Sequence, residues 1–350
     1  MASDFQETEP GVFRRPDRSV PGGYRYRIEG AALRELGEPD ANDQPIGLQK
    51  YPRLVDDDGA LQSFVEVTYS PAEDDRWRRM FADIEKTAPG RAAEDIIDGL
   101  AWLRRLGGAE KVPVLRTMSD DIEAVSGFRL VPALGLVSND RFFKMLMEGK
   151  FPVTLSLRRE EEFGYTPFPD IFHDLVGHAP MFLNHDFCDF VRKIGALGLH
   201  FAGQPKSQSM VSKIFWYTIE FGLKATKYTG PDGNDAYKDV RVYGAGIASS
   251  VSETQISVEA ARTTGDRKIN RLPFGLERLL CSHYEYEKPQ ELYFVIESYR
   301  HLAALFTIDL GAFIMHVLDQ LRRGEKTMIP QGTLLPGEDA CCIPPNPPRG

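Results

Sequence analysis

Residues 169–182 read PDIFHDLVGHAPMF and combine a helix start, two histidines and a helix stop. Asp170 is a suitable helix N-cap, and Pro180 ends any helix that begins there. His173 and His178 are five residues apart. In an α-helix five residues advance about 500°, which leaves the two imidazoles about 140° apart around the axis. We therefore expect both rings to reach one ion only if His173 lies at an irregular helix start.

Two histidines at this spacing are more often core or surface residues than metal ligands. The pattern also differs from the His-Glu-x-x-His motif of zinc proteases, because Asp174 follows the first histidine and one residue too many separates the pair. Metal binding by this pair therefore depends on finding a third ligand elsewhere in the chain.

Residues 214–223 read IFWYTIEFGL, and Glu220 is the single acid in this apolar run. A carboxylate buried there is costly unless it is paired or bound to a cation. Alternatively, Glu220 points outward or pairs with Lys224, four residues further on. Together with the two histidines, Glu220 completes a set of two imidazoles and one carboxylate, which is the ligand set of non-haem iron(II) oxygenases.

Three stretches carry a family resemblance: TPFPDIFHDLVGHAP over 166–180, FWYTIEFGL over 215–223 and YGAGIASS over 243–250. In this order and spacing they resemble the pterin-dependent aromatic amino acid hydroxylases, the family of the phenylalanine, tyrosine and tryptophan hydroxylases. The resemblance extends over roughly residues 64–298. It implies a mainly α fold with small β elements, in a single large catalytic domain of the aromatic amino acid hydroxylase type.

Composition and resemblance together divide the chain into three segments. Residues 1–62 are rich in Pro, Gly, Asp and Arg with little periodicity, and we expect them to be extended or partly disordered. Residues 63–325 form the expected catalytic iron and pterin domain, and residues 326–350 a Pro-rich C-terminal tail. We expect no regulatory amino-acid-binding domain before the catalytic one, as in bacterial members of the family.

Periodicity predicts several elements around these motifs. Apolar residues recur at helical spacing over 92–106, and 187–199 also favours a helix with small residues that permit close packing. Alternation predicts strands over 150–158 and 292–297. Ser119, followed by acids, is a candidate N-cap for a further short helix.

The resemblance implies how the cofactors are held. The expected iron(II) ligands and catalytic residues are His173, His178 and Glu220. The expected tetrahydrobiopterin-binding residues are Val137, Ser138, Phe142 and Asp174, with the Phe142 ring stacked on the pterin. Without the resemblance, Phe142 is better explained as a core residue of a helix over 140–148. Dioxygen is the expected co-substrate.

The resemblance also implies a substrate site made of Arg158, Tyr165, Thr166, Pro169, Asp170, Phe172, Trp216 and Ser249. Arg158 would bind the substrate carboxylate, because a guanidinium fork matches a carboxylate in geometry. Asp170 could orient Arg158, and Ser249 would hydrogen-bond a ligating histidine. One residue departs from the family: Phe215 stands where most members have a tyrosine near the iron, so hydrogen bonds of that hydroxyl have no counterpart here.

The expected reaction is hydroxylation of the ring of an aromatic amino acid, with L-phenylalanine to tyrosine as the default. Val295 stands where tyrosine hydroxylases of the family carry an acid, which favours phenylalanine or tryptophan. Hydroxylation of tryptophan, or meta-hydroxylation of phenylalanine in a biosynthetic pathway, stays open. More remote alternatives are a zinc hydrolase with the same three ligands and a non-catalytic metal- or pterin-binding protein. The first lacks a clear glutamate base beside His173, and the second would be expected to lack a ligand.

Charge and composition limit the partners. The net charge of −9 argues against nucleic acid or an anionic membrane as the main partner. The partner that the resemblance implies is a small-molecule aromatic amino acid. Four cysteines in 350 residues do not make a disulfide framework, and Cys341 and Cys342 are adjacent without metal-site spacing. A reducing cytoplasm fits best. No heptad repeat of the tetramer-forming kind is evident, and the oligomeric state is not readable.

Overall fold

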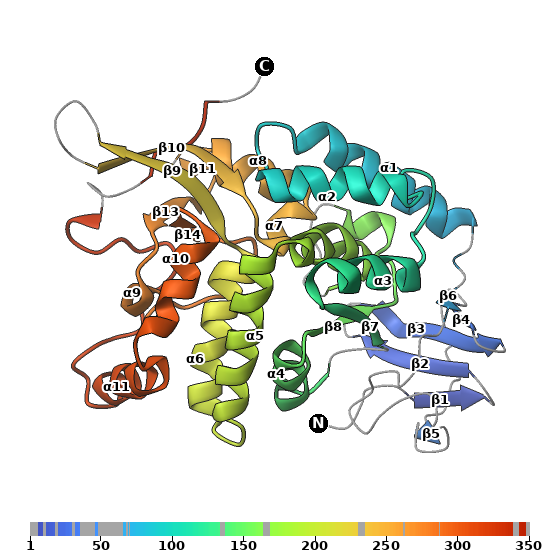
Figure 1. The fold of residues 1–350 in the computed structure, drawn as a ribbon, viewed down its shortest axis with the longest axis horizontal. Helices are drawn as coiled ribbons and strands as arrows, with labels where there is room; N and C mark the ends of the chain where they lie inside the picture. Colours follow the sequence, from blue (N-terminus) through green and yellow to red (C-terminus); the bar gives the residue numbers. More distant parts are fainter. Residues whose placement is uncertain are drawn as a thin grey trace.

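The computed structural model shows a mainly α-helical protein with small sheets, as the sequence predicted (Figure 1). It describes residues 69, 71–133, 137–163, 169–229, 235–261, 263–286, 288–338 and 343–347. Between residues 6 and 67 it otherwise describes only the backbone of six short strands.

The helices surround a core of large aromatic side chains, in which Trp77, Phe172 and Phe187 are fully buried. Helices α5 and α6 run side by side through the middle of the molecule (Figure 1). The described α-helices are α1 (Pro71–Thr87), α2 (Glu94–Arg105), α3 (Leu115–Ser126), α4 (Asn139–Met147), α5 (His185–His200), α6 (Pro205–Phe215), α7 (Ala245–Ala248), α8 (Val251–Glu259), α9 (Leu276–Leu280), α10 (Tyr299–Ala303) and α11 (Leu310–Arg322). Shorter turns are the 3-10 turns η2 (Glu160–Glu162), η4 (Ala179–Leu183) and η6 (Ala304–Thr307), and the π-helical turns η3 (His173–His178) and η5 (Trp216–Glu220).

A four-stranded sheet in the order β10-β9-β14-β13 lies beside the helices. Its strands are β9 (Leu223–Thr229), β10 (Asp235–Val242), β13 (Asn270–Pro273) and β14 (Leu292–Ile296), with β9 antiparallel to β10 and parallel to β14. Strand β7 (Arg129–Ala133) pairs in parallel with β8 (Lys150–Thr154), and β11 (Thr263–Thr264) with β12 (Arg267–Lys268) in an antiparallel hairpin. Strand β9 begins three residues after Glu220 and β8 ends four residues before Arg158, so both sheets lead into the predicted site.

The predicted helices and strands in this part of the chain are found with small shifts. Helix α2 and strands β8 and β14 lie within their predicted ranges. Helix α5 begins at His185, two residues earlier than predicted, because the Asn184 side chain caps it by accepting from the Phe187 N–H at 3.0 Å.

The predicted N-cap role of Ser119 is wrong. Helix α3 begins at Leu115, and Ser119 is buried in its interior. The Ser119 hydroxyl instead donates to the Leu130 carbonyl at 3.2 Å and accepts from the Leu130 N–H at 3.1 Å. A buried hydroxyl needs such partners, and here they join α3 to strand β7.

The N-terminal strands form a sheet that composition did not predict. Its order is β5-β1-β2-β3-β4-β6, and the strands are β1 (Gln6–Glu9), β2 (Val12–Asp17), β3 (Val20–Glu29), β4 (Ala32–Glu35), β5 (Ile46–Gly47) and β6 (Glu66–Val67). The rest of residues 1–62 lie outside the described residues, as do Cys341 and Cys342. The division into segments 1–62, 63–325 and 326–350 stays a prediction.

Part of the C-terminal segment is docked onto the sheet. Ile343 is buried, and its N–H donates to the Arg271 carbonyl at 3.0 Å. The Asn346 side chain accepts from the Val240 N–H and donates to the Val240 carbonyl. No single helix among the described ones is long and apolar enough to cross a membrane, although Tyr299–Thr307 and Leu310–Arg322 pass that test as a pair bent by 81°.

Candidate active site

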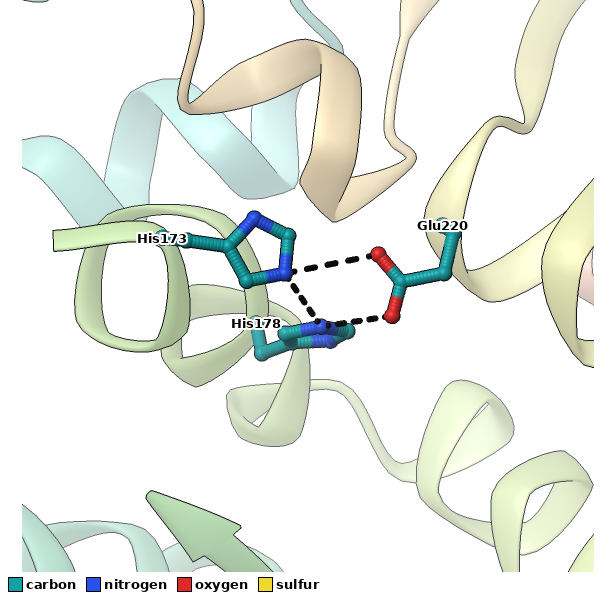
Figure 2. A group of neighbouring side chains, drawn as sticks. All are labelled: His173, His178 and Glu220. Atoms are coloured by element: carbon teal, nitrogen blue, oxygen red, sulfur yellow. Dashed lines mark hydrogen bonds and ion pairs between the residues drawn. The ribbon is translucent and has the colours of Figure 1, made fainter. Parts of the chain in front are cut away.

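The predicted metal ligands converge on one point (Figure 2). The Nε2 atoms of His173 and His178 are 3.1 Å apart. The Glu220 carboxylate places one oxygen 3.4 Å from His173 Nε2 and the other 3.0 Å from His178 Nε2. Bonds of about 2.1 Å to a divalent ion put two donor atoms about 3.0 Å apart at right angles and about 3.4 Å apart at tetrahedral angles. The three residues therefore fit a single metal ion.

The tautomer of His173 also suits a ligand. Its Nδ1 lies 3.1 Å from the Ser249 hydroxyl, which itself donates to the Ala245 carbonyl at 2.9 Å. Because that hydroxyl proton is already used, Ser249 accepts from His173 Nδ1–H, and the Nε2 lone pair faces His178 and Glu220. This arrangement fixes both the orientation and the tautomer of a metal-binding imidazole.

Two π-helical turns bring the ligands together. In η3 the Ala179 N–H donates to the Asp174 carbonyl, five residues back, and in η5 the Phe221 N–H donates to the Trp216 carbonyl at 2.9 Å. With such i→i+5 bonds a turn takes more than four residues, so side chains five apart return to nearly the same side. The angle of about 140° between the two imidazoles holds for a regular α-helix and does not apply to this π-turn.

Gly177 permits the close contact between η3 and α7. A Cβ atom at this position would lie 2.6 Å from the Ala245 carbonyl oxygen and 2.9 Å from Ala245 Cα. Both are backbone atoms of the first residue of α7, the helix that Ser249 follows as C-cap. The missing side chain therefore lets the turn with both histidines approach the hydroxyl that orients His173.

Burial and the contacts among the three predicted ligands shift their pKa values in opposite directions. Burial alone would raise the pKa of Glu220, but the charges and hydrogen bonds of His178 and His173 hold it well below its usual value. Burial lowers the pKa of His178, whereas the hydrogen bond and charge of Glu220 overcome burial and raise the pKa of His173. An ionised carboxylate and a neutral imidazole are the forms that bind metal.

A pocket of about 240 Å³ opens beside the three ligands. Its described lining residues are Ala133, Val137, Asn139, Phe142, Phe151, Pro152, Thr154, Pro169, His173, Asp174, His178 and Glu220. Burial raises the pKa of Asp174 to about 7, against the charge of His173, and the carboxylate accepts from the Thr154 N–H at 2.6 Å. The pocket thus combines an apolar aromatic wall with a carboxyl group that titrates near neutral pH.

Phe142 is half-buried at the edge of this pocket, with its ring in edge contact with Phe151 and Phe215. The Phe142–Phe215 ring centroids are 5.2 Å apart, and Phe215 also lies 6.4 Å from the His178 ring. Phe215 therefore places an apolar ring between Phe142, the residue predicted to stack on the pterin, and the predicted ligand His178.

Arg158 and Asp170 form a buried bidentate pair. Arg158 Nε and Nη2 donate to the two Asp170 oxygens at 3.0 and 2.7 Å, and the Arg158 N–H donates at 2.7 Å. Asp170 also accepts from the His173 N–H at 2.9 Å, which is the predicted N-cap contact. One carboxylate therefore positions both the predicted substrate arginine and the helix start that carries the first ligand.

The remaining predicted residues are placed differently. Tyr165 and Thr166 lie outside the described residues. Ser138 caps α4 by accepting from the Arg141 N–H, and it is not among the pocket's lining residues. Phe172 is buried under the Arg158 guanidinium at 5.4 Å, and Trp216 is half-buried. Arg158, Phe172 and Trp216 likewise do not line the 240 Å³ pocket.

Phe151 and Thr154 belong to the pocket although the motifs did not indicate them. Phe151 and Thr154 lie on the strand that leads to Arg158, and the Phe151 ring contacts His178 at 4.4 Å between centroids. The sequence could have indicated both residues, because they lie on the predicted strand that leads to Arg158.

Comparisons with known proteins agree with this site. Residues 60–308 match the family model of the biopterin-dependent aromatic amino acid hydroxylases. The chain is 32% identical over 271 residues to phenylalanine-4-hydroxylase of Chromobacterium violaceum, covering 77% of this chain and 85% of that protein. It is 33% identical over 234 residues to phenylalanine-4-hydroxylase of Ralstonia nicotianae, covering 67% and 69%.

A solved structure of the iron- and phenylalanine-bound phenylalanine hydroxylase from Chromobacterium violaceum superposes with a TM-score of 0.67 at 29% identity. The superposition covers 86% of this chain and 99% of that one. The single catalytic fold, the iron and pterin cofactors and the monooxygenase class that the resemblance implied are thereby confirmed. This chain belongs to the biopterin-dependent aromatic amino acid hydroxylases.

Proposed function

We propose that this protein hydroxylates free L-phenylalanine to tyrosine, with iron(II) held by His173, His178 and Glu220 and with tetrahydrobiopterin and dioxygen as co-reactants. The main support is that the Nε2 atoms of both histidines and the Glu220 carboxylate oxygens lie 3.0–3.4 Å from one another beside the 240 Å³ pocket. The relatives named phenylalanine-4-hydroxylase support this substrate.

When bound, the iron and the reduced pterin supply dioxygen activation and two electrons, so that one oxygen atom enters the ring and the other leaves as water. The protein positions the reactants. Phe142 offers an aromatic face and edge at the pocket, and Val137 and Asp174 line it. We assign these three residues to the pterin, and Ser138 to the cap of the helix that presents Phe142.

The substrate carboxylate is assigned to Arg158. Asp170 occupies the Nε–Nη2 edge of the guanidinium. Among the described residues no hydrogen bond involves Nη1, so the Nη1–Nη2 edge can form a second fork. Phe172 and Asp170 fix the guanidinium plane from one face and one edge. Pro169, Trp216 and the predicted Tyr165 and Thr166 complete the proposed substrate site.

We assign the ring specificity to the apolar side chain of Val295, which is not among the described lining residues of the 240 Å³ pocket. Val295 is buried on β14 and pairs in register with Leu223, three residues after Glu220. A tyrosine hydroxyl facing this side would lose its hydrogen bonds to water without a polar partner from Val295. This desolvation cost applies to tyrosine and not to phenylalanine, so phenylalanine is favoured as the substrate.

We also place the protein in the cytoplasm. Cys188 and Cys281 are buried free thiols, and burial raises the pKa of Cys188 to about 11. Such thiols are inert structural residues in a reducing compartment.

The test starts from metal-free protein loaded with iron(II) without oxygen. Oxygenated buffer, tetrahydrobiopterin and either phenylalanine, tryptophan or tyrosine are then added, and products are read by chromatography and mass. We expect one oxygen gained on phenylalanine, at the para position, only when iron and pterin are both present. A hydroxylated tryptophan or a meta product would replace the substrate assignment, and no product with iron bound would sink the proposal.

Glu220→Gln is the matched control, because it keeps the shape of the side chain and removes its charge. We expect this variant to bind iron(II) at least about tenfold more weakly and to yield no product, since loss of an anionic ligand weakens a divalent site. Full activity in this variant would remove Glu220 from the metal centre.

A further inference from the structure

Gln290 is a buried amide whose hydrogen bonds are all satisfied. Its side-chain oxygen accepts from Trp216 Nε1 at 2.9 Å and from Gln331 Nε2 at 2.7 Å. Its side-chain nitrogen donates to the carbonyls of Glu285 at 2.9 Å and Lys288 at 3.0 Å. Because an indole N–H can only donate, the oxygen of Gln290 faces Trp216. The contact is therefore a specific and oriented one.

Trp216, the residue that Gln290 contacts, begins the π-turn η5, which ends at the predicted metal ligand Glu220. Trp216 is the first residue of η5 and Glu220 the last, and the Phe221 N–H closes the turn on the Trp216 carbonyl. The indole is also enclosed by the rings of Tyr284 and Phe221, each 4.6 Å away between centroids. The position of the indole thus fixes where η5 begins.

The Glu220 carboxylate depends on this turn for its position. Among the described residues, its ion-pair partners are the two ligand histidines alone. No backbone or side-chain donor outside the metal centre is found to orient it within that part of the chain. Its placement therefore follows from the backbone of η5, which the Trp216–Gln290 hydrogen bond ties to the segment before β14.

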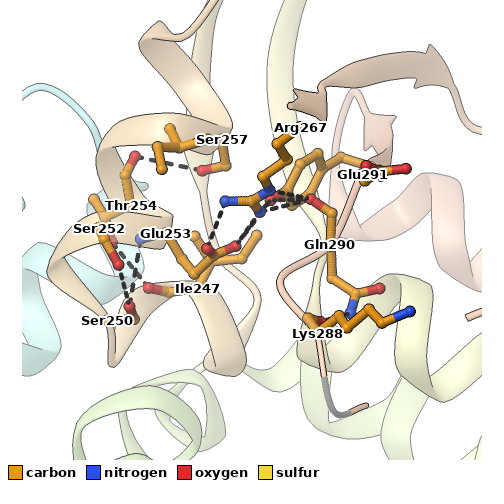
Figure 3. Close-up of polar contacts among 12 residues, drawn as sticks. Ile247, Ser250, Ser252, Glu253, Thr254, Ser257, Arg267, Lys288, Gln290 and Glu291 are labelled. Atoms are coloured by element: carbon orange, nitrogen blue, oxygen red, sulfur yellow. Dashed lines mark hydrogen bonds and ion pairs between the residues drawn. The ribbon is translucent and has the colours of Figure 1, made fainter. Parts of the chain in front are cut away.

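The same segment is joined through Arg267 to Glu253 on helix α8 (Figure 3). The Gln290 carbonyl accepts from Arg267 Nε at 3.0 Å and Nη2 at 2.6 Å. Arg267 pairs with both oxygens of the buried Glu253 at 2.8 and 2.7 Å. Glu253 lies on α8, which begins directly after Ser249 and Ser250. Breaking this ion pair would leave the buried Glu253 carboxylate without its partner, so the pair resists displacement although Arg267 is partly exposed.

We propose that Gln290 is a positioning residue of the metal centre. Its amide fixes the Trp216 indole, and through it the π-turn that carries Glu220, while its carbonyl links this segment to the Arg267–Glu253 pair and helix α8. The inference rests on the proposed function in one respect, that His173, His178 and Glu220 hold a divalent metal ion.

The test uses metal binding without turnover. Cobalt(II) is titrated into the metal-free full chain, and its visible absorption bands report binding without substrate or pterin. We expect Gln290→Met to bind cobalt(II) about tenfold more weakly, the size of effect found when groups that orient a ligand are removed. Trp216→Phe keeps an aromatic ring against Tyr284 and Phe221 but removes the donor, so we expect a similar loss.

A double-mutant cycle separates positioning from general destabilisation. If Gln290 acts through the indole, Gln290→Met should change cobalt(II) affinity by less than about twofold in a Trp216→Phe background. Gln331→Leu is the control: it removes the other donor to the same oxygen, together with the acceptor of the Glu291 N–H, and should leave the affinity within about twofold of the parent because the Trp216 contact stays. Thermal unfolding of each variant confirms that the compared proteins are folded.

Four outcomes would overturn the inference. Parent-like cobalt(II) affinity in Gln290→Met, or an equal loss with and without Trp216, would show that Gln290 does not position the centre through the indole. Where Gln290→Met does not fold, parent-like affinity in Trp216→Phe leads to the same conclusion. If the parent chain itself binds no cobalt(II), both the inference and the proposed function are wrong, because both need a metal ion at His173, His178 and Glu220. If the double-mutant cycle gives the expected affinities but no amino acid is hydroxylated, only the proposed function is wrong.

Discussion

Replacing Lys213 with methionine should change how the stability of the protein depends on pH. Lys213 lies on α6, the helix that continues into η5, and is only 7% exposed. Its Nζ donates to the Leu280 carbonyl at 2.9 Å and lies 3.4 Å from Met328 Sδ. Among the described residues no carboxylate forms an ion pair with it. Burial lowers the pKa of Lys213 from 10.5 to about 8, against a smaller opposing effect of Cys281.

The sign of the effect follows from the proton balance. Below pH 8 the amine is charged in both the folded and the unfolded protein, so the folded state bears the full cost of burying the charge. Between about pH 8 and 10.5 the unfolded state binds the proton and the folded state does not, so the free energy of unfolding rises with pH. At about 1.4 kcal/mol for each tenfold change, the fall in pKa corresponds to about 3 kcal/mol in total. Of this, about 2.5 kcal/mol is gained between pH 7 and pH 10.

The assay is urea unfolding of the parent and of Lys213→Met at pH 7 and pH 10. The free energy of unfolding of the parent should rise, relative to the variant, by about 2.5 kcal/mol between these two conditions. The lost hydrogen bond to Leu280 affects both conditions alike and cancels in this comparison. A difference between the two proteins that stays constant within about 0.5 kcal/mol would refute the reasoning, because it would mean that the amine is solvated in the folded state.

Three further predictions concern the site. Gly177→Ala should lower the free energy of unfolding by about 1–3 kcal/mol and weaken cobalt(II) binding, because its Cβ would lie 2.6 Å from the Ala245 backbone. Thermal unfolding and metal titration measure these two effects. The control is Gly311→Ala, whose Cβ would have its nearest contact at 3.4 Å, and it should lose neither stability nor metal affinity. Ser249→Ala removes the acceptor of His173 Nδ1–H and should weaken metal binding by about tenfold or more, measured by cobalt(II) titration; unchanged affinity would mean that the imidazole orients itself. Arg158→Lys should mainly raise KM for the amino acid substrate, because lysine cannot form the fork to a carboxylate, and steady-state kinetics with an unchanged KM would argue against that role.

The elements with a clear period were predictable from the sequence. The apolar face of Ile96, Leu100 and Leu103 gives α2 within its predicted range, and those residues are buried. The boundaries were less predictable where side chains compete with the backbone. Serine is a residue type that often caps helices, which is why Ser119 was predicted to start one. Its hydroxyl instead hydrogen-bonds the Leu130 backbone, and the helix continues through Ser119.

The identity of the metal ligands was predictable, but their geometry was not. A sequence gives residue order, and the choice between i→i+4 and i→i+5 hydrogen bonds depends on what the turn packs against. Here the choice depends on contacts such as Gly177 against Ala245, which are 68 residues apart in the chain. For the same reason Gln290 carried no local signal, because its partners Trp216 and Arg267 come from distant segments.

Asp170 connects the candidate metal centre to Arg158, the residue proposed to bind the substrate carboxylate. Asp170 accepts from the His173 N–H with one oxygen and from Arg158 with both, so the helix start and the guanidinium share one carboxylate. Deleting a residue between the histidines would leave four residues, which advance about 400° in a regular α-helix, so both imidazoles could still lie on one side of the axis. The π-turn instead places one additional residue between the helix start, where Asp170 holds the His173 N–H and the Arg158 side chain, and His178. Such turns are rare in proteins and frequent at functional sites, and here one lies between the capped helix start and the second predicted ligand.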